Sequence, residues 1–493
     1  GHGSKIKDYI EAVLRLQPNL LPKNILIIVP EDSFFEELKS LCHKDNLITV
    51  DNIINPDLIN KFSFHNADRI IILDNYGGDI SSFLDILFNL NLFRKTKNNL
   101  NNLKLYYELS DYNLYSILHS SVRKLISKES KIELSIMNIN NINSRISLLN
   151  NPIDLKIKEN SINSRIVFIF IGWSSFSDSL LNQIMRIGYY QCKTSIYIVV
   201  DNDIKSYENK INNSYPGLCD SNYAKEIISI NYINSHALNN LSLGAKDTVS
   251  AVVCGNNPDK IFLQAIDITS NKITNLRYIF VEIPDGSGYN KVINAINNEQ
   301  KNYSMVTVGS HSKAFELSEK MDKYAKLSHQ KYLKEREDNG LRVQKFDGSY
   351  ENSGDEDWEN LDDTCRNWNR SPLDHSEIKL RVLANINNLP MHSRDSDTGD
   401  IFIHNSLKHK AISLIHHFKT KNTLNEDIEL LSKLEHNRWS GEKFSEGWVF
   451  GKETNKSQKI SSFLIPYEDL SDSIKQYDRE QVIQQLENLI VIN

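Results

Sequence analysis

Strand-length apolar segments, each followed by a helix-forming segment, recur along much of this 493-residue chain. The clearest is Arg165–Ile171, RIVFIFI, which is apolar at nearly every position, as in a strand buried on both faces of a parallel sheet. It leads through Gly172–Asp178 into a helix predicted for Ser179–Ile187. Because alternating strands and helices form parallel sheets with right-handed crossovers, the pattern predicts an α/β protein.

The strand–helix pattern occurs in two series separated by the Asn-rich stretch Asn138–Ile162. We predict one domain over residues 5–150 and a second over residues 151–312. The first series comprises strands Asn24–Pro30, Leu47–Asp51, Ala67–Asp74 and Leu103–Glu108, with helices Phe34–Cys42 and Ser81–Phe93. The second comprises strands Arg165–Ile171, Thr194–Val200, Thr248–Cys254 and Arg277–Ile283, with helices Ser179–Ile187 and Lys260–Ile268.

Both series resemble the regulator-of-K⁺-conductance (RCK, or TrkA N-terminal) family, a Rossmann variant. The resemblance rests on strand order and on the segments Ala67–Leu73 and Asp247–Gly255. In that family the first turn is usually Gly-x-Gly-x-x-Gly and binds a pyrophosphate. The first series has Val29–Ser33 there, whose acidic pair Glu31 and Asp32 would repel a phosphate. We therefore expect no dinucleotide in the first domain.

The second series has Gly172-Trp173-Ser174-Ser175-Phe176 at this turn and keeps one glycine of the motif. Ser174, Ser175 and the following helix N-terminus could hold an anion, and Asp201 could accept a ribose hydroxyl. Gly172, Ser174, Ser175 and Asp201 are therefore the candidate cofactor-binding residues. A degenerate Rossmann-like unit used for assembly is the alternative that we favour.

Site-forming side chains are concentrated in Leu431–Gly451, LSKLEHNRWSGEKFSEGWVFG. Helical spacing directs Leu431 and Leu434 to a core, and Gly447 is a suitable C-terminal stop. An arginine beside a tryptophan, as at Arg438, can stack a flat ring and bind an anion. Spacing alone favours the alternative of an amphipathic helix with a buried tryptophan and solvated charges.

The same stretch resembles the ryanodine receptor repeat (RyR) domain. Five elements match in order, His436–Trp439, Glu442–Lys443, Gly447–Gly451, Leu464–Tyr467 and Tyr477–Asp478. The chain departs from the family at Ser461–Phe463, where many relatives carry His-Pro before the Leu-x-Pro segment.

Upstream segments extend this resemblance. Ala325, His329 and Tyr332 match the opening helix of bacterial RyR domains, and Asn369–Arg370 with Asp374–His375 match the second. We assign residues 313–493 to a mainly α-helical RyR domain. Its predicted elements are a helix over Ser310–Asn339, an acidic solvated loop at Glu351–Asp363 with Trp358 as an anchor, Pro372 in a first helical turn, and helices Leu407–Phe418, Ser471–Gln476 and Arg479–Leu489.

The residue types of this region predict a small, anionic, ring-bearing ligand. Trp439 or Trp448 would stack a base, while Arg438 and other cations would hold phosphate. The full candidate set is Asn369, Arg370, Asp374, His375, Lys379, Glu435, His436, Arg438, Trp439, Trp448, Tyr467 and Asp478.

These features predict a ligand-sensing regulatory protein rather than an enzyme. Its RyR domain would bind a nucleotide or nucleotide-derived second messenger. As the RCK resemblance implies, the paired α/β domains would form a dimer or ring that gates an effector, such as a potassium channel, on a removed segment or separate chain. Family analogy adds a role in bacterial antiphage defence. The alternatives are an NAD(P)- or nucleotide-using enzyme of the second domain and an oligomerisation scaffold.

Several other classes find no support in the sequence. There is neither a P-loop nor a G-x-S-x-G motif, so we predict no catalytic residues. The net charge of -6 gives no support for nucleic-acid binding. The five cysteines are scattered without CxxC, which indicates a reducing cytoplasm. His404, His409, His416 and His417 have no cysteine partner, so we predict no metal site.

No apolar run approaches the roughly 18–20 residues needed to cross a bilayer. The opening Gly1–Ser4 resembles a remnant of an expression tag, which leaves open an upstream membrane segment. We therefore expect a cytoplasmic protein, with a position at the inner membrane face if such a segment or partner exists.

Overall fold

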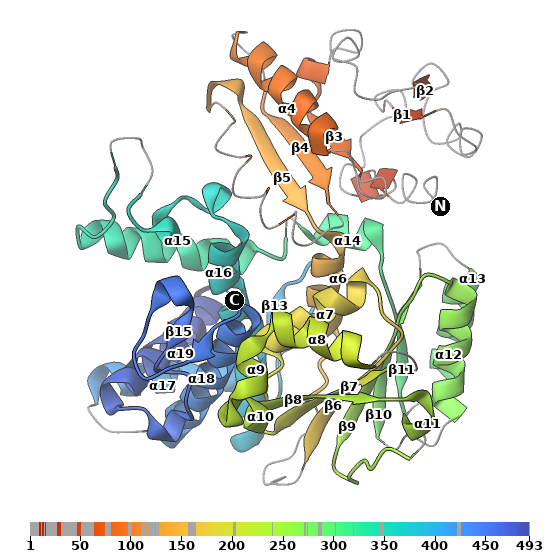
Figure 1. Cartoon of the computed structure of the whole chain (residues 1–493). Helices are drawn as coiled ribbons and strands as arrows, with labels where there is room; N and C mark the ends of the chain where they lie inside the picture. Colours follow the sequence, from red (N-terminus) through yellow and green to blue (C-terminus); the bar gives the residue numbers. More distant parts are fainter. Residues whose placement is uncertain are drawn as a thin grey trace. The chain divides into compact units, whose positions relative to one another are not determined.

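The computed structural model divides the chain into two compact units. The first unit comprises residues 1–142, 310–320 and 332–366, and the second comprises residues 143–309, 321–331 and 367–493. Figure 1 shows the ribbon. The described residues are 9–10, 12–13, 15, 27–30, 47–50, 64–73, 80–96, 101–109, 115, 118, 122, 126, 128–155, 164–200, 204–238, 240–270, 273, 275–283, 288–300, 302–318, 320–345, 350–421 and 425–492.

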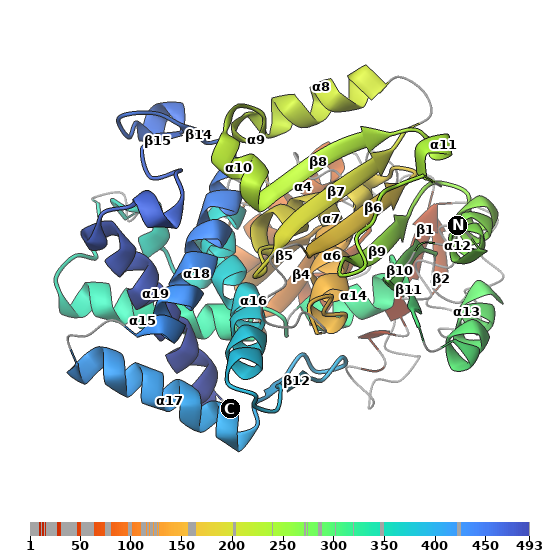
Figure 2. The ribbon, with the colours of Figure 1, turned by 90° about the horizontal axis from the view of Figure 1, so that it is seen from below.

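A six-stranded parallel sheet forms the centre of the second unit (Figure 2). Its strands run in the order β8-β7-β6-β9-β10-β11, and every neighbouring pair is parallel. Numbered along the chain this is 3-2-1-4-5-6, the Rossmann-like order. Strands 2 and 3 are added on one side of strand 1 and strands 4 to 6 on the other, so the order of addition switches sides between strands 1 and 4. The strands are β6 (Arg165–Ile171), β7 (Lys193–Val199), β8 (Ile228–Ile233), β9 (Thr248–Val253), β10 (Leu276–Glu282) and β11 (Ser304–Val308).

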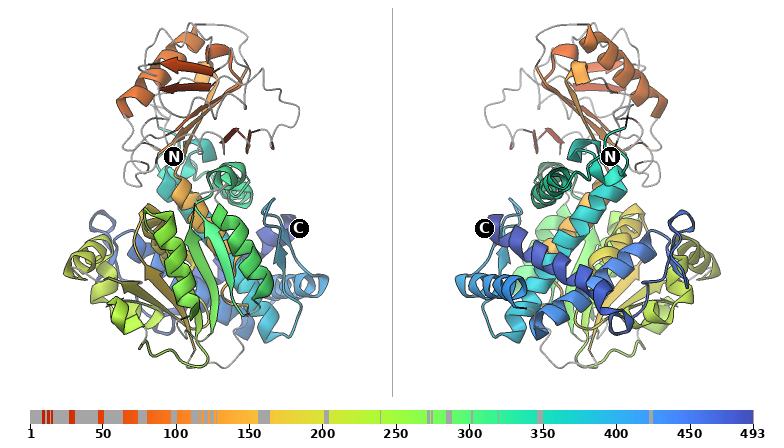
Figure 3. Two further views of the ribbon diagram at one scale, coloured as in Figure 1. Left: turned by 90° about the vertical axis from the view of Figure 1, so that its right-hand side faces the viewer. Right: turned by 90° about the vertical axis from the view of Figure 1, so that its left-hand side faces the viewer.

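Helices cover both faces of this sheet because alternate strand residues point to opposite sides. On one face Phe168 and Phe170 pack with Leu180 of α7, and on the other Val167 and Ile169 pack with α12. Figure 3 shows α12 and α13 side by side in its left view. The helices are α7 (Ser175–Ile187), α8 (Ile204–Ser214), α9 (Pro216–Asp220), α10 (Asn222–Ile227), α11 (Ser235–Leu238), α12 (Pro258–Ser270) and α13 (Gly288–Glu299).

The C-terminal helices share the hydrophobic core on the α7 face of the sheet. Helix α18 packs against both α19 and α7, and Phe444 and Leu464 lie in the same buried cluster as Phe168 and Leu180. The sheet and these helices are therefore one packed body. The elements are α16 (Asp363–Ile386), β12 (Ser393–Arg394), β13 (Ile401–Phe402), α17 (Asn405–Thr420), α18 (Glu426–Ser445), β14 (Val449–Phe450), η8 (Lys456–Gln458), β15 (Ile460–Ser461), η9 (Tyr467–Asp469) and α19 (Asp472–Ile492).

The first unit contains a parallel three-stranded sheet, ordered β3-β4-β5, and the parallel pair β1-β2. Phe83 and Leu87 of α4 pack with Leu105 and Tyr107 of β4 in its larger core. The elements are β1 (Ile27–Pro30), β2 (Leu47–Val50), η3 (Phe64–Asn66), β3 (Arg69–Ile72), α4 (Ile80–Lys95), β4 (Leu103–Glu108), η5 (Lys128–Ser130), β5 (Ile132–Met137), α14 (His311–Ser318), η6 (Ser353–Asp355) and η7 (Trp358–Asn360). Helices α6 (Ile139–Asn150), α15 (Lys323–Asp338) and α16 contribute residues to both units.

The predicted fold class, two parallel-sheet regions followed by a mainly helical region, is confirmed. Strands β4 and β6 have the predicted bounds. Strands β5, β8 and β11 were missed, because their short sequences carry more polar residues than the buried central strands. Glu31, Asp32 and Asp201, on which two nucleotide predictions rest, lie outside the described residues.

Four local predictions were wrong. The single helix over 310–339 is two helices, α14 and α15, separated at Asp322, whose carboxylate accepts from two arginines. Pro372 lies inside α16 rather than in its first turn, since the helix begins at Asp363. The two final helices are the single α19. In the acidic loop Asp355 is buried beside Arg336 instead of solvated, although Trp358 is buried as expected.

Candidate functional site

Helix α18 has capping residues at both ends. The Asn425 side chain accepts from the backbone N–H of Ile428, which caps the helix. At the other end Gly447 has a φ of +83°, and Trp448 N–H donates to the Lys443 carbonyl at 2.9 Å. This Schellman arrangement confirms the predicted stop at Gly447 and turns Trp448 back along the helix.

Four charged side chains from α16 and α18 form a buried ion network. Lys379 Nζ lies 2.6 Å from Glu435 Oε2, and Glu435 Oε1 accepts from Arg438 Nε at 3.0 Å. Arg438 Nη1 donates to Glu442 Oε2 at 2.8 Å. All four side chains are at most 3% exposed. We call Lys379, Glu435, Arg438 and Glu442 the buried network.

Two further polar groups complete the surroundings of Lys379. Its Nζ donates to Gln485 Oε1 at 2.8 Å and lies 2.9 Å from His375 Nδ1. His375 Nε2 lies 2.7 Å from the Tyr189 carbonyl oxygen. An imidazole that accepts at Nδ1 and donates at Nε2 is neutral, which agrees with a pKa lowered well below the usual value by burial and by Lys379.

The network balances desolvation against opposite charge. Burial raises the pKa of Glu435, but Arg438 and Lys379 outweigh burial and hold that pKa far below its ordinary value. Burial lowers the pKa of Lys379 to about 8, and Glu435 offsets part of this shift. The charges therefore depend on one another for their ionised states.

The other candidate ligand residues fall into separate groups. Arg370 and Arg145 both bind Asp322, and Arg145 Nε donates to Asp374 Oδ2 at 2.8 Å. Asn369 is half-buried on the same helix as Arg370.

His436 organises a further group of candidates. Its Nε2 lies 2.8 Å from the Ile465 carbonyl oxygen, and its Nδ1 lies 3.3 Å from Asp478 Oδ2. The half-buried Trp439 stacks on the His436 ring, with centroids 5.7 Å apart. Tyr467 is buried and donates to Glu429 Oε2 at 3.2 Å.

Two glycines allow α18 and its C-terminal turn to approach the sheet-covering layer closely. A Cβ at Gly441 would lie 1.7 Å from the hydroxyl oxygen of Tyr189, a residue that follows the end of α7. A Cβ at Gly217 of α9 would lie 2.2 Å from the Trp448 carbonyl oxygen. Any side chain at either position would force the two layers apart.

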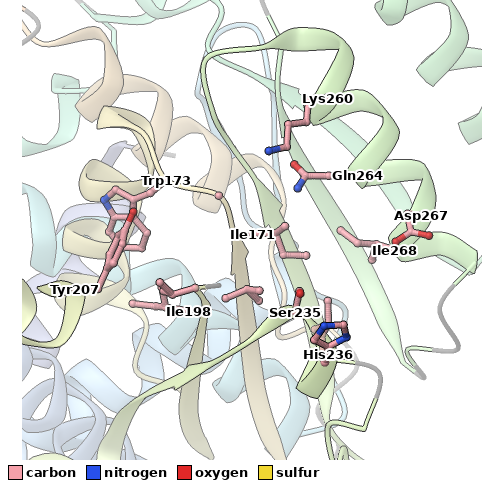
Figure 4. Close-up of a pocket in the computed structure, with 14 residues that line it drawn as sticks. Ile171, Trp173, Ile198, Tyr207, Ser235, His236, Lys260, Gln264, Asp267 and Ile268 are labelled. Carbon is pink, nitrogen blue, oxygen red and sulfur yellow. The ribbon is translucent and has the colours of Figure 1, made fainter. Parts of the chain in front are cut away.

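A pocket of about 520 Å³ opens at the carboxyl edge of the six-stranded sheet (Figure 4). Ile171 and Ile198 form its apolar floor. Trp173 and Tyr207 line one side, Lys260 and Gln264 line another, and Ser235 and His236 line a third. The remaining lining residues are Gly172, Val199, Val200, Leu238, Asp267 and Ile268. In a Rossmann-like sheet this edge is where ligands bind.

Trp173 is held in one orientation at the pocket wall. Its Nε1 donates to Asp178 Oδ1 at 3.0 Å, and its ring lies 5.7 Å from Phe170 and 6.0 Å from Tyr207. Lys210 Nζ sits 5.8 Å from the ring centroid. A ring fixed in this way is suited to pack against a flat ligand.

The predicted cofactor residues have different places around this edge. Gly172 lines the pocket, whereas Ser174 caps α7 by accepting from Ser177 N–H, and Ser175 is exposed at the start of the helix. Sequence reasoning missed Tyr207, His236, Lys260 and Gln264. For α12 a signal existed, because its lining residues Lys260, Gln264, Asp267 and Ile268 recur at helical spacing.

The C-terminal elements are similar to a known protein family. The family model described as RyR domain matches residues 415–493. This segment is a RyR domain. It contains α18, α19 and the end of α17. No curated protein matches the chain. The comparisons identify no RCK or TrkA-N family in the α/β regions, so that resemblance stays a prediction.

The RyR domain match also divides the candidate ligand residues. Glu435, His436, Arg438, Trp439, Trp448, Tyr467 and Asp478 lie inside it, and Asn369, Arg370, Asp374, His375 and Lys379 lie before it. The buried network thus joins the RyR domain to α16. The RyR domain also contacts Tyr189 directly, through the close approach of Gly441.

The part of the chain that the structure describes contains neither a cluster of metal ligands nor a helix that could span a membrane. Within it no group of three or more His, Cys, Asp or Glu side chains could hold a metal ion, and His404 acts as the N-cap of α17. Among the described helices none is both long and apolar enough to cross a bilayer.

Proposed function

We propose that this protein is a small-molecule sensor in which a nucleoside-like ligand binds the sheet-edge pocket and the RyR domain responds through α7. One observation carries the proposal. Helix α7 begins beside the pocket, after Gly172 and Trp173, and α18 of the RyR domain packs on the same helix. A ligand that changes the position of α7 therefore acts on the RyR domain through direct packing.

The pocket lining supports a ligand with a flat ring and polar substituents. Trp173 and Tyr207 provide aromatic surface, and the floor is aliphatic. Lys260, Gln264 and His236 provide hydrogen-bonding groups around the rim. Small-molecule sites combine an apolar lining with a few placed polar groups, and nucleosides have both kinds of surface.

The buried network supports a structural role for the central RyR charges. Arg438 is already bound by Glu435 and Glu442, and its side chain is 3% exposed. A phosphate could reach it only if these ion pairs opened, which would leave carboxylates buried without partners. In the proposal the network holds the RyR domain on α16 while the pocket takes the ligand.

A second candidate site is formed by Lys443 and Trp448 of the RyR domain together with Trp368 of α16. Lys443 Nζ sits 5.0 Å from the ring centroid of Trp368 and 5.3 Å from that of Trp448. Trp368 is 42% exposed. Lys443 Nζ already binds Glu446 Oε2 at 2.8 Å, and Trp368 Nε1 donates to the same carboxylate at 2.8 Å. A ring-bearing anion could therefore stack on these indoles, as the sequence prediction for Trp448 requires, but would reach the ammonium group only by displacing Glu446.

The proposal also covers how the protein oligomerises and which effector it controls. We propose that the ligand-bound sensor acts through a homo-oligomer or an effector such as a channel, as the RCK resemblance implies. Sedimentation of the full chain with and without ligand would test this part, because a ligand-dependent change in mass is expected.

Titration calorimetry and thermal shift of the full chain with adenosine, AMP and NAD⁺ test the sensor. Gln264→Trp should fill the pocket and abolish the thermal shift, whereas Leu263→Trp should keep it, because Leu263 is 66% exposed and does not line the pocket. Hydrogen exchange of α18 should slow when adenosine binds the wild-type chain.

The other outcomes separate the alternatives. Adenosine binding that survives Gln264→Trp but is lost on Trp448→Ala would move the site to the RyR surface. Turnover of NAD⁺ would favour the enzyme. If no nucleoside or nucleotide shifts the melting temperature, an oligomerisation scaffold becomes the better interpretation.

A further inference from the structure

We infer that Glu282 occupies the place where a Rossmann-type sheet binds pyrophosphate, so that the sheet edge accepts a nucleoside-sized ligand and rejects a dinucleotide. The identity of the accepted ligand rests on the proposed function of the pocket. The exclusion of a diphosphate rests on the ends of three strands, β6, β9 and β10.

The turn after β6 leaves no room over the end of β9. Gly172 has a φ of +76°, and a Cβ there would lie 2.1 Å from the Cys254 carbonyl oxygen. The first turn of a dinucleotide-binding sheet instead keeps glycines so that a pyrophosphate can approach the backbone. Here the backbone approaches the neighbouring strand, and bulky Trp173 follows at once.

The Glu282 carboxylate comes to the same place from the end of β10. Its Oε2 accepts from Gly255 N–H at 3.2 Å. Ser174, at the N-cap of α7, and Cys254 lie close enough to the carboxyl group to influence its pKa. Negative charge is favoured at a helix N-terminus, so the carboxylate takes the position and the donors that a phosphate would use.

Burial contributes to the exclusion. The Glu282 side chain is half-buried, and burial raises its pKa, while Ser174 and the Gly255 N–H counter part of the shift. A diphosphate would bring further negative charge against a partly desolvated anion, with little water to screen the repulsion.

The pocket over β6 and β7 stays open. Its lining includes Gly172 and Trp173 before α7 and four residues of α12, but it does not include Glu282. It provides Lys260 as a cation but no second lysine or arginine among the described lining residues. One ring system with at most one anionic group fits this half of the crevice, whereas a dinucleotide must continue across Glu282.

Glu282→Gln in the full chain tests the inference, because it keeps the shape and removes the charge. Binding of adenosine, NAD⁺ and inorganic pyrophosphate is measured by calorimetry and thermal shift. Wild-type protein should bind adenosine and give no measurable response to NAD⁺ or pyrophosphate. Glu282→Gln should gain affinity for pyrophosphate and NAD⁺ by on the order of tenfold, with adenosine binding unchanged.

Two further variants separate an effect of the Glu282 charge from a folding defect. Glu282→Asp keeps the charge and should show no gain. Glu282→Ala also removes the charge and should show the gain, so either neutral variant that folds suffices. If wild-type protein binds NAD⁺ as tightly as adenosine, the inference is overturned without any variant.

The two proposals fail in different ways. Adenosine binding with no gain in the folded neutral variants overturns the role of Glu282 and leaves the sensor. A gain for pyrophosphate without any adenosine binding supports the role of Glu282 and rejects the nucleoside ligand.

Discussion

The buried network of the RyR domain and the pocket at the sheet edge use similar residues in opposite ways. Both contain a lysine, carboxylates, a histidine nearby and aromatic rings. In the network, Lys379 and Arg438 are buried and bound by Glu435 and Glu442. At the pocket, Lys260 and His236 are exposed around a hollow of about 520 Å³.

The difference shows that residue types alone do not identify a ligand site. Charges that neutralise one another inside a core give a domain its position, because breaking one pair leaves the others buried. Charges around a concave surface leave space for a ligand. Changes to the network should therefore cost stability, and changes to the pocket should cost binding.

Glu435→Ala should give the largest effect. It leaves Lys379 buried without its carboxylate partner, and we expect a loss of about 3–5 kcal/mol in the free energy of unfolding by urea denaturation. Lys433→Ala on the same helix is the control, because its ion pair with Glu468 is exposed and should contribute about 0.5 kcal/mol. Equal losses for the two variants would contradict the distinction between network and surface.

Acid should weaken the buried ion pairs next. Burial raises the pKa of Glu377, but Arg394 and His392 outweigh this and lower it to about 2. Because the folded-state pKa lies below the unfolded value, this group stabilises the fold above pH 4.5 and loses its contribution as pH falls towards 2. The loss should approach about 3 kcal/mol.

Urea titrations across this pH range measure that loss. Glu377→Gln should flatten the acid limb of the stability curve. Asp267→Asn at the exposed pocket rim should leave it as in the wild type. If the stability of Glu377→Gln falls with acid as steeply as that of the wild type, other groups are responsible for the acid sensitivity.

Gly441→Ala should have a smaller effect of about 1–3 kcal/mol, through overpacking against Tyr189. Gly288→Ala is the matched control, because no heavy atom lies within 4 Å of a Cβ there. Tyr189→Leu combined with Gly441→Ala should cost less than the sum of the single changes. Additive losses would show that the two residues are not in contact.

Lys260→Ala should have the smallest effect on stability, within about 0.5 kcal/mol of wild type, because the side chain is exposed. It should weaken adenosine binding by about threefold to tenfold, the loss expected for a hydrogen bond. Calorimetry with Lys291→Ala, an exposed lysine on α13 outside the pocket lining, provides the control. An unchanged dissociation constant in Lys260→Ala would exclude this lysine from the site.

The sequence was most informative where local chemistry decides the structure. Apolar runs located β4 and β6, and Gly447 located the end of α18. The RyR resemblance placed Lys379 and Glu435 in one candidate ligand set, but nothing in the sequence shows that these two side chains bind each other at 2.6 Å. Asp322, at the helix break, likewise binds Arg145 and Arg370, which are far from it in the sequence.

The candidate site was predictable only in part for the same reason. Gly172 was recognised because the first turn of a Rossmann-like sheet has a sequence signature. Tyr207, His236 and Lys260 come from three separate helices that meet only after the sheet has formed. Glu282 is the last residue of the buried strand β10, and its role depends on the position of β10 in the sheet.

The glycine contacts of α18 restrict how this helix can move. The Gly441 backbone lies against the Tyr189 hydroxyl, and the Gly217 backbone lies against the Trp448 carbonyl, without room for a Cβ at either glycine. Movement of Tyr189 would therefore press directly on α18, and movement of α9 would press on the turn that follows α18. The C-terminal half of α18 is therefore held at two points, so the helix and the layer that covers the sheet are expected to move together.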